Sequence, residues 1–318
     1  QRMPARIGAT KRGRFFVLDR RTGAPIYPVT ERPVPQGAAK GDWTAKTQPY
    51  SYGFANLAGP QLSEERMWGA TPLDQLWCRI AFRKARYEGE FTPPGTSPAI
   101  FYPGSAGGSN WGSVTIDAAR GLMIANALYM PDIGRLIPRA EADRMAAAYG
   151  EEGNASAFAF PQKGTPYAMD RQVFLGPLGA PCPQPPYGTI NAIDLKTGKL
   201  LWSERLGDAR HAGPLGLSSH LPIRMGMPNF GGSMATSGGV VFIGASQDRR
   251  IRAFNIGNGK ELWSHGLPAI GAATPMTFRS PKSGRQYVVI AAGGHPALPG
   301  PAGGSILAFA LPQQESKQ

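Results

Sequence analysis

Residues 192–202 read AIDLKTGKLLW, and residues 253–263 read AFNIGNGKELW. Each copy has an apolar run, a polar turn that ends in glycine, and a second run that ends in tryptophan. Asp or Asn opens such a turn because its side chain can accept hydrogen bonds from nearby backbone amides, and glycine readily adopts positive φ. The pattern predicts two strand pairs, with Trp202 and Trp263 packed between adjacent sheets.

A third copy, VLDRRTG at residues 17–23, keeps only the first half of the pattern. The two complete copies begin at residues 192 and 253, an interval of 61 residues that fits one four-stranded propeller blade with its loops. The chain therefore predicts an all-β fold, a β-propeller with four to five blade equivalents; a β-sandwich or a β-solenoid is the alternative. Further strands are expected at residues 112–117, 121–126, 239–245, 250–254, 286–292 and 305–310.

Other segments do not follow the repeat, and we treat residues 1–318 as a single partial propeller domain that carries them as insertions. Residues 30–66 are rich in proline and predict a long surface loop, as do residues 135–171, in which residues 139–151 are expected to form one helix. Residues 74–88 fit either a strand pair or a short helix.

Composition and charge restrict the function. The chain has 42 Gly and 31 Pro among 318 residues, as expected for short strands joined by many turns. The net charge of +13 has three interpretations: a basic surface attracted to anionic lipid headgroups, a site for an anionic small ligand, or nucleic-acid binding. The basic residues are scattered and form no basic helix, so we expect no nucleic-acid partner.

The two cysteines, Cys78 and Cys182, have no clustered histidine partners, which argues against a zinc site. They are either buried thiols or one long-range disulfide. No apolar run approaches the 18 residues of a membrane span, and the first 17 residues lack the apolar core of a signal peptide.

Several long strings resemble the membrane-bound PQQ-dependent (quinoprotein) dehydrogenases of the glucose/quinate/shikimate group. They extend in order along the whole chain: RPVPQGAAKGD at 32–42, MWGAT at 67–71, DQLWCR at 74–79, RYEG at 86–89, FTPP at 91–94, MGMP at 225–228, ATPM at 273–276 and YVVIAAGGH at 287–295.

This resemblance implies an eight-bladed propeller in the periplasm, associated with the inner membrane through helices that precede it. It implies PQQ as cofactor, with a divalent cation, Ca²⁺ or Mg²⁺, and it assigns no metal ligands in this chain. The reaction would oxidise a cyclic polyol or sugar and pass the electrons to ubiquinone. Such a reaction needs a base for the hydroxyl proton and a cation at the quinone oxygen.

The resemblance also implies roles for particular residues. Lys11 matches the lysine that contacts the quinone oxygen. Without the resemblance, Lys11 would be interpreted as a solvated lysine in a turn. Asn110, Trp111 and Asn126 match positions that line the cofactor pocket; Trp111 as plain core and Asn126 as a hairpin cap are the alternatives. Two further matches are Asp248, near the cofactor or a simple turn aspartate, and His295, a residue for substrate.

One departure limits the resemblance. The family's catalytic aspartate lies in a Trp-Asp-x-Asp stretch upstream of the matched lysine, and this sequence has none. At about 60 residues per blade, 318 residues also cannot close eight blades. We therefore expect a C-terminal portion (a split subunit, a truncated product or a fragment) that works with the N-terminal half or with a membrane-anchor subunit.

Two questions stay open at this point. A propeller without the catalytic base could instead be a non-catalytic scaffold that binds proteins. Among the substrates, the NWGS stretch at 110–113 and the DQLWC stretch at 74–78 favour quinate/shikimate over glucose.

Overall fold

The computed structural model describes residues 3–110, 112–149, 161–162 and 164–312. By its internal contacts the chain divides into two units. Unit 1 comprises residues 1–108, 129–184 and 213–216, and unit 2 comprises residues 109–128, 185–212 and 217–318.

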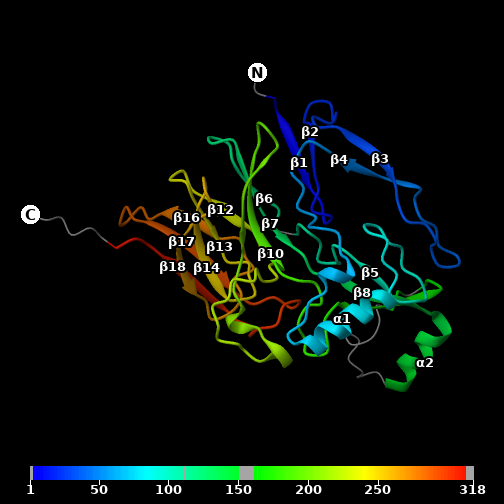
Figure 1. The fold of residues 1–318 in the computed structure, drawn as a ribbon. Coiled ribbons are helices and arrows are strands. Elements are labelled where there is room, and N and C mark those ends of the chain that lie inside the picture. The colour runs from blue at the N-terminus through cyan, green and yellow to red at the C-terminus, as the bar shows by residue number, and fades with distance from the viewer. Residues whose placement is uncertain (1–2, 111, 150–160, 163, 313–318) are drawn as a thin grey trace, which may run out of the picture. The chain divides into compact units, whose positions relative to one another are not determined.

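Unit 2 is built from three antiparallel sheets that follow one another along the chain (Figure 1). The first has the order β11-β10-β7-β6, the second β12-β13-β14-β15 and the third β16-β17-β18. Their strands are β6 (Val114–Asp117), β7 (Leu122–Leu128), β10 (Gly188–Asp194), β11 (Leu200–Arg205), β12 (Ser233–Ala235), β13 (Val240–Ile243), β14 (Arg250–Asn255), β15 (Glu261–Gly266), β16 (Met276–Arg279), β17 (Gln286–Ala292) and β18 (Ser305–Phe309).

The repeated pattern forms the last two strands of both four-stranded sheets, as predicted. In the first copy Thr197 N donates to Asp194 Oδ1 at 2.6 Å, and Gly198 N donates to Asp194 O at 2.8 Å. In the second copy Asn255 accepts the matching bond from Gly259 N at 2.9 Å. The turn glycine has a φ of 70° in the first copy and 72° in the second.

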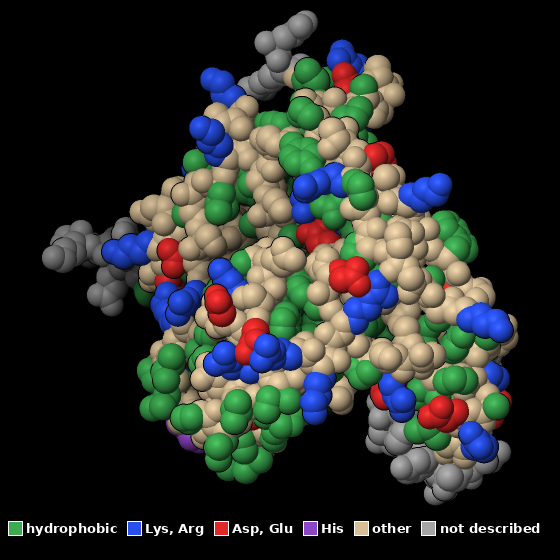
Figure 2. Space-filling view, turned by 45° about the vertical axis from the view of Figure 1, so that its right-hand side comes forward, with side chains coloured by type: hydrophobic (Ala, Val, Ile, Leu, Met, Phe, Trp, Pro, Cys, Tyr) green, Lys and Arg blue, Asp and Glu red, His purple; other side chains and the backbone are tan. Residues whose placement is uncertain are grey.

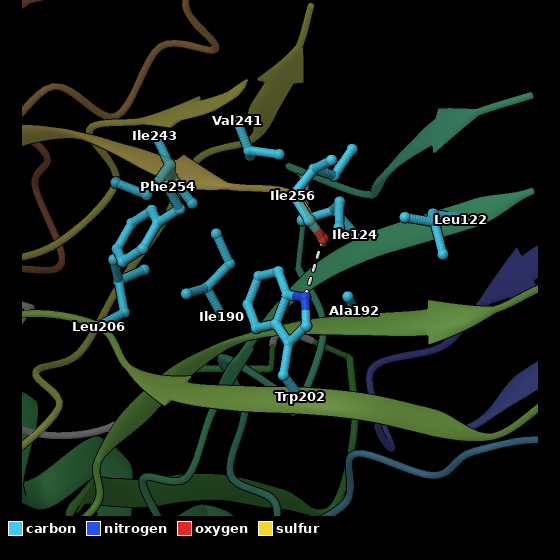
Figure 3. Packing of buried hydrophobic residues seen from close by; sticks show 11 residues of the cluster. Leu122, Ile124, Ile190, Ala192, Trp202, Leu206, Val241, Ile243, Phe254 and Ile256 are labelled. Carbon is cyan, nitrogen blue, oxygen red and sulfur yellow. Dashed lines mark hydrogen bonds between the residues drawn. The ribbon is translucent and has the colours of Figure 1, made fainter. Parts of the chain in front are cut away.

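Trp202 joins the first sheet to the second, which confirms its predicted place. Its ring lies in a core with residues of both sheets, and its Nε1 donates to Ile256 O at 2.9 Å (Figure 3). The full set in this core is Leu122, Ile124, Ile190, Ala192, Trp202, Leu206, Val241, Ile243, Ala245, Phe254 and Ile256. Trp263 does less at the next junction: its ring meets Phe309 of β18 edge-on, with centroids 5.1 Å apart, but it is 38% exposed, so it is not packed between the sheets as Trp202 is.

Unit 1 contains shorter sheets and both α-helices. Its sheets are the pair β1-β2, the pair β3-β4 and the antiparallel trio β5-β8-β9. The elements are β1 (Ala5–Ala9), β2 (Phe15–Asp19), β3 (Val29–Pro33), β4 (Thr47–Ser51), α1 (Pro72–Lys84), β5 (Ala99–Phe101), β8 (Asp132–Pro138), α2 (Arg139–Tyr149) and β9 (Tyr167–Val173). Single 3-10 turns occur at Glu64–Arg66 and Pro214–Gly216 in this unit and at Ala209–His211 in unit 2.

A disulfide between Cys78 and Cys182 lies in a hydrophobic core of unit 1 and decides between the two states expected for these residues. Both cysteines are fully buried. Around them pack Leu62, Met67, Ile100, Tyr102 and Phe174. The bond ties α1 to the segment that follows β9.

The structure confirms most of the expected strands and helices and differs from the expectation in two segments. Strands occur at all six expected places, the segment 74–88 contains a helix, and α2 fits the helix expected at 139–151. The loop expected at 30–66 instead contains the β3-β4 hairpin, because its residues pair from Val29↔Ser51 to Pro33↔Thr47. The second expected loop, 135–171, also contains the end of β8 and most of β9.

Positive charge does not gather in one area of the viewed surface. Figure 2 shows Lys and Arg side chains in separate groups, several of them beside Asp or Glu. Local ion pairs account for some of this, for example Arg79 with Glu64 and Arg224 with Glu261. Among the described residues, no helix has the length and apolar character needed to cross a membrane.

Candidate cofactor-binding site

Lys11 lies in the turn between β1 and β2 of unit 1. Gly13 completes this turn with a φ of 71°, and its N–H donates to Thr10 O at 2.9 Å. A Cβ on Gly13 would lie 2.6 Å from backbone atoms of Leu57 and Ala58, so only glycine allows this approach. The turn is therefore fixed against the underlying backbone, and the Lys11 side chain is exposed.

A neighbouring loop sets the direction of that side chain. Lys11 Nζ donates to Ser105 O at 2.9 Å, and Gly108 N donates to Lys11 O at 2.6 Å. Asp132, which is buried, accepts a bond from Ser105 N at 2.7 Å and pairs with Arg171 Nη1 at 2.6 Å. The Asp132–Arg171 pair thus holds the loop that orients the Lys11 ammonium group.

The two arginines beside Lys11 have structural partners instead. The Arg12 guanidinium lies 4.5 Å over the ring of Phe91, and burial lowers the pKa of Arg12. Arg14 forms an ion pair with Glu90 at 2.9 Å. Of these three basic side chains, Lys11 is the one that presents its charge to solvent.

In unit 2, Asn126 connects β7 to residues 229–232, which precede β12. Its Nδ2 donates to Asn229 Oδ1 at 2.6 Å and to Gly231 O at 3.2 Å. Asn229 in turn donates to Ala127 O at 2.9 Å. Asn126 is buried in the middle of a strand, so it is not a hairpin cap.

The loop that contains Asn110 reaches the same segment. Asn110 O accepts a bond from Ser113 N at 2.9 Å, and a Cβ on Gly112 would lie 1.9 Å from Gly231 O. This backbone-to-backbone approach places the loop against residues 229–232. Trp111 lies outside the described residues.

His295 is placed on the segment by ring stacking. Its imidazole lies parallel to the ring of Phe230, with centroids 4.5 Å apart and planes 5° apart. Its Nδ1 accepts a bond from Ala297 N at 3.1 Å. In the neutral ring the proton therefore sits on Nε2, which becomes a hydrogen-bond donor.

Asp248 is buried and bound to other protein groups. Its carboxylate accepts bonds from Arg252 Nη1 at 3.0 Å and from Asp208 N at 3.0 Å. Burial acts to lower the pKa of Arg252, but the bond to Asp248 and the charges of Asp248, Glu261 and Asp208 outweigh it, so this pKa is raised. Arg252 therefore stays charged, and the pair fixes the turn that leads into β14.

Lys11 belongs to unit 1, whereas Asn110, Asn126, Asp248 and His295 belong to unit 2. Within unit 2, residues 229–232 contact Asn126, His295 and the Asn110 loop, and Gln247 N donates to Pro228 O just before it. No sequence pattern pointed to Phe230, Asn229, Asp132 or Arg171, because their contacts join residues far apart in the chain. Among the described residues, no group of three or more His, Cys, Asp or Glu side chains could hold a metal.

Comparison with known proteins identifies the family. Residues 1–288 match the family described as PQQ: glucose/ethanol/alcohol dehydrogenase, beta-propeller domain. The quinohemoprotein alcohol dehydrogenase from Comamonas testosteroni has a similar fold, with a TM-score of 0.52 over 99% of this chain and 37% of that one, at 22% identity. The chain therefore belongs to the PQQ-dependent quinoprotein dehydrogenase family, which confirms the predicted β-propeller class.

Three curated relatives show how far the similarity extends. A quinate/shikimate dehydrogenase (quinone) of Acinetobacter baylyi is 44% identical over 97% of this chain and 38% of its own length. A glycerol dehydrogenase large subunit of Gluconobacter thailandicus is 46% identical over 98% of this chain and 43% of its own. The quinoprotein glucose dehydrogenase of Escherichia coli is 43% identical, with 98% of this chain and 39% of its own length covered. The chain thus spans about two fifths of the length of these relatives.

The Lys11 region fits a quinone of the PQQ type. PQQ is an anionic quinone, and the Lys11 ammonium is exposed beside a loop held by a second cation, Arg171. The bond to Ser105 O uses one of the three donors of an ammonium group. Lys11 is thus able to hold a quinone oxygen.

Proposed function

We propose that this chain is the C-terminal, cofactor-side portion of a PQQ-dependent dehydrogenase that oxidises a polyhydroxylated substrate. The observation that carries the proposal is the oriented and exposed Lys11 ammonium, since its arginine neighbours are engaged in packing. A non-catalytic scaffold has no need of a lysine held in this way.

Two residues of the chain have proposed roles in the reaction. When bound, PQQ supplies a quinone that accepts two electrons from the alcohol. Lys11 would stabilise negative charge on a quinone oxygen. His295, whose neutral ring carries its proton on Nε2 because Nδ1 accepts a bond from Ala297 N, would orient a substrate hydroxyl. The base that takes the hydroxyl proton is expected in a Trp-Asp-x-Asp stretch of the complete protein.

Four further residues would line or support the cofactor pocket, with Ca²⁺ or Mg²⁺ as the expected metal: Asn110, Trp111, Asn126 and Asp248. The buried bonds of Asn126 and Asp248 favour support, because both side chains already bind protein groups.

The proposed location is the periplasmic side of the inner membrane, with ubiquinone as electron acceptor. The Cys78–Cys182 disulfide supports an oxidising compartment, because cytosolic proteins seldom keep such bonds. The missing part of the site would come from the N-terminal half of the protein or from a membrane-anchor subunit.

The substrate is proposed to be a cyclic polyol or sugar, with quinate or shikimate tested first. The names of the relatives widen the panel, since one acts on quinate or shikimate, one on glucose and one on glycerol. All of these are polyhydroxylated. Glycerol therefore joins quinate, shikimate and glucose as an assay substrate.

Reconstitution tests the proposal. The chain is mixed with the N-terminal half of a relative, PQQ, Ca²⁺ and a dye acceptor, and quinone-dependent oxidation of the four substrates is measured. Lys11→Met should abolish oxidation, while Lys40→Met, at another surface lysine, should not. If the complemented mixture shows no oxidation and PQQ causes no saturable quenching of tryptophan fluorescence, the scaffold function is favoured instead.

A further inference from the structure

Contacts on one side of helix α1 fix its orientation about the helix axis. Thr71 caps its first turn by accepting a bond from Asp74 N at 3.2 Å. Asp74 is buried and accepts bonds from Ala70 N at 3.0 Å and from Leu178 N at 3.2 Å. One turn further on, Cys78 is disulfide-bonded to Cys182. The opposite side of α1 is therefore exposed.

That outward side carries four large apolar residues. Leu73 is 79% exposed, Leu76 52%, Trp77 44% and Ile80 45%. Their spacing of three, four and seven residues places them in one stripe along the helix. A soluble surface helix normally buries such a stripe, so this one is available to another partner.

The polar residues around the stripe are neutral or basic. The exposed polar residues of α1 are Gln75, Arg79, Arg83 and Lys84, and the only acidic residue of the helix, Asp74, is buried. Glu64, in the 3-10 turn before the helix, pairs with Arg79 at 2.9 Å and with Arg83 at 3.1 Å. Lys84, at the end of the stripe, has no such ion pair among the described residues.

We propose that α1 docks this protein on an anionic lipid surface, with the stripe in the interfacial layer of the bilayer. A helix with Leu, Ile and Trp on one face and basic residues at its margin is typical of helices that lie in a membrane interface. The net charge of +13 favours a negatively charged surface. This inference rests on the proposed membrane association and names the surface that makes the contact.

Vesicle binding tests the inference without PQQ or substrate, so its failure is separate from failure of the proposed dehydrogenase. The oxidised chain is sedimented with vesicles of phosphatidylcholine, alone or mixed with phosphatidylglycerol. We expect binding to the mixed vesicles that weakens with added salt. Trp77 fluorescence should shift to the blue, and this shift should be missing in Trp77→Phe.

The stripe itself is tested by Leu73→Ser/Ile80→Ser, which should weaken vesicle binding by about 10-fold or more because two apolar side chains are lost from the interface. The matched control is Ile306→Ser in β18, where Ile306 is 77% exposed, and it should bind as the parent does. Circular dichroism and an intact disulfide establish that the variants are folded.

Three outcomes overturn the inference. The first is no binding to anionic vesicles, and the second is binding that Leu73→Ser/Ile80→Ser leaves unchanged. The third is a protein that does not bind vesicles but self-associates with rising concentration, with the self-association lost in Leu73→Ser/Ile80→Ser. The stripe would then be an interface between protein molecules.

Discussion

His295 is held by two contacts that act on different parts of its ring. Phe230 covers one face, and Ala297 N binds Nδ1, so the ring plane and the position of the proton are both defined. A histidine prepared in this way can present the same donor to each substrate molecule. Phe230 is thus a positioning residue under the proposed function.

Phe230→Leu should lower kcat/KM of the reconstituted enzyme about 2- to 10-fold, because an aromatic stack contributes roughly 0.5–1.5 kcal/mol. Phe230→Tyr keeps the stack and should retain activity. Kinetics of both variants at several pH values would check this. If Phe230→Leu matches the parent while His295→Ala is impaired, the stack has no positioning role.

Arg252 is the centre of a buried charge cluster. It pairs with Asp248, lies 3.4 Å from Glu261 and is 5% exposed in its side chain. Arg252→Met leaves the buried Asp248 carboxylate without its partner, so it should lower the free energy of unfolding by about 3–5 kcal/mol. Urea unfolding would measure this. The double variant Arg252→Met/Asp248→Leu should lose less, and an equal or larger loss would contradict the pairing argument.

His211 makes stability depend on pH. Burial, and next the charge of Arg249, lower the pKa of His211, and Arg249 Nη2 lies 2.6 Å from His211 Nδ1. The unfolded chain therefore takes up this proton first, at about pH 6.5. Above that pH the protonation of His211 does not reduce the free energy of unfolding. Below it, the free energy of unfolding falls as the pH drops toward the lower folded-state pKa. Urea unfolding between pH 7.5 and 5 should show this loss, and His211→Gln should reduce it while His265→Gln should not.

The repeated turn also has a packing role in unit 2. A Cβ on Gly259 would lie 2.7 Å from the ring of Trp202, whereas the same position in the third copy, Gly23, has open space around it. Both glycines have positive φ, 72° and 77°. The turn of one sheet is therefore the surface on which the tryptophan of the preceding sheet packs.

Gly23→Ala should cost only the backbone strain, about 1–2 kcal/mol. Gly259→Ala should cost about 1–3 kcal/mol more, because it also overpacks Trp202. Thermal unfolding of both variants would compare them. The extra loss should shrink in a Trp202→Leu background, and equal losses at the two glycines would show that Trp202 can move away.

The turns were predictable because their determinants lie within five residues of each other. The exposed stripe of α1 was not, because the segment 74–88 fits a helix or strands and only the Cys78–Cys182 bond and Asp74 show which side faces inward. The site was predictable in part. The positions came from the family resemblance, but the contacts of Asn126, Asp248 and His295 with distant residues depend on how separate sheets meet.

The sheets of the chain are not all alike, as they would be in a series of equivalent blades. The sequence predicted one partial propeller domain, and the internal contacts divide the described chain into two units. The four-stranded sheets lie in unit 2, where both complete copies of the repeat occur, while unit 1 has shorter sheets and the helices. The complete copies of the repeat therefore mark the four-stranded sheets, and the half copy covers the end of β2 and the turn that follows it.

The disulfide gives the two units different responses to reduction. It joins residues 104 apart and belongs to unit 1, and unit 2 has no cysteine. A cross-link that closes a loop of this length restricts the unfolded chain and contributes about 4–5 kcal/mol in the chain-entropy description. Cys78→Ser/Cys182→Ser, or reduction of the parent, should therefore weaken unit 1 by a comparable amount.

Hydrogen exchange of the two units would check this prediction. Amides of β8 and β9, next to the disulfide core, should exchange faster after reduction, while amides of β13 and β14 in unit 2 serve as the internal reference. Faster exchange in unit 1 alone would locate the stabilisation where the cross-link is. Equal acceleration in both units would mean instead that they unfold as one cooperative structure, and the disulfide would then stabilise the whole chain.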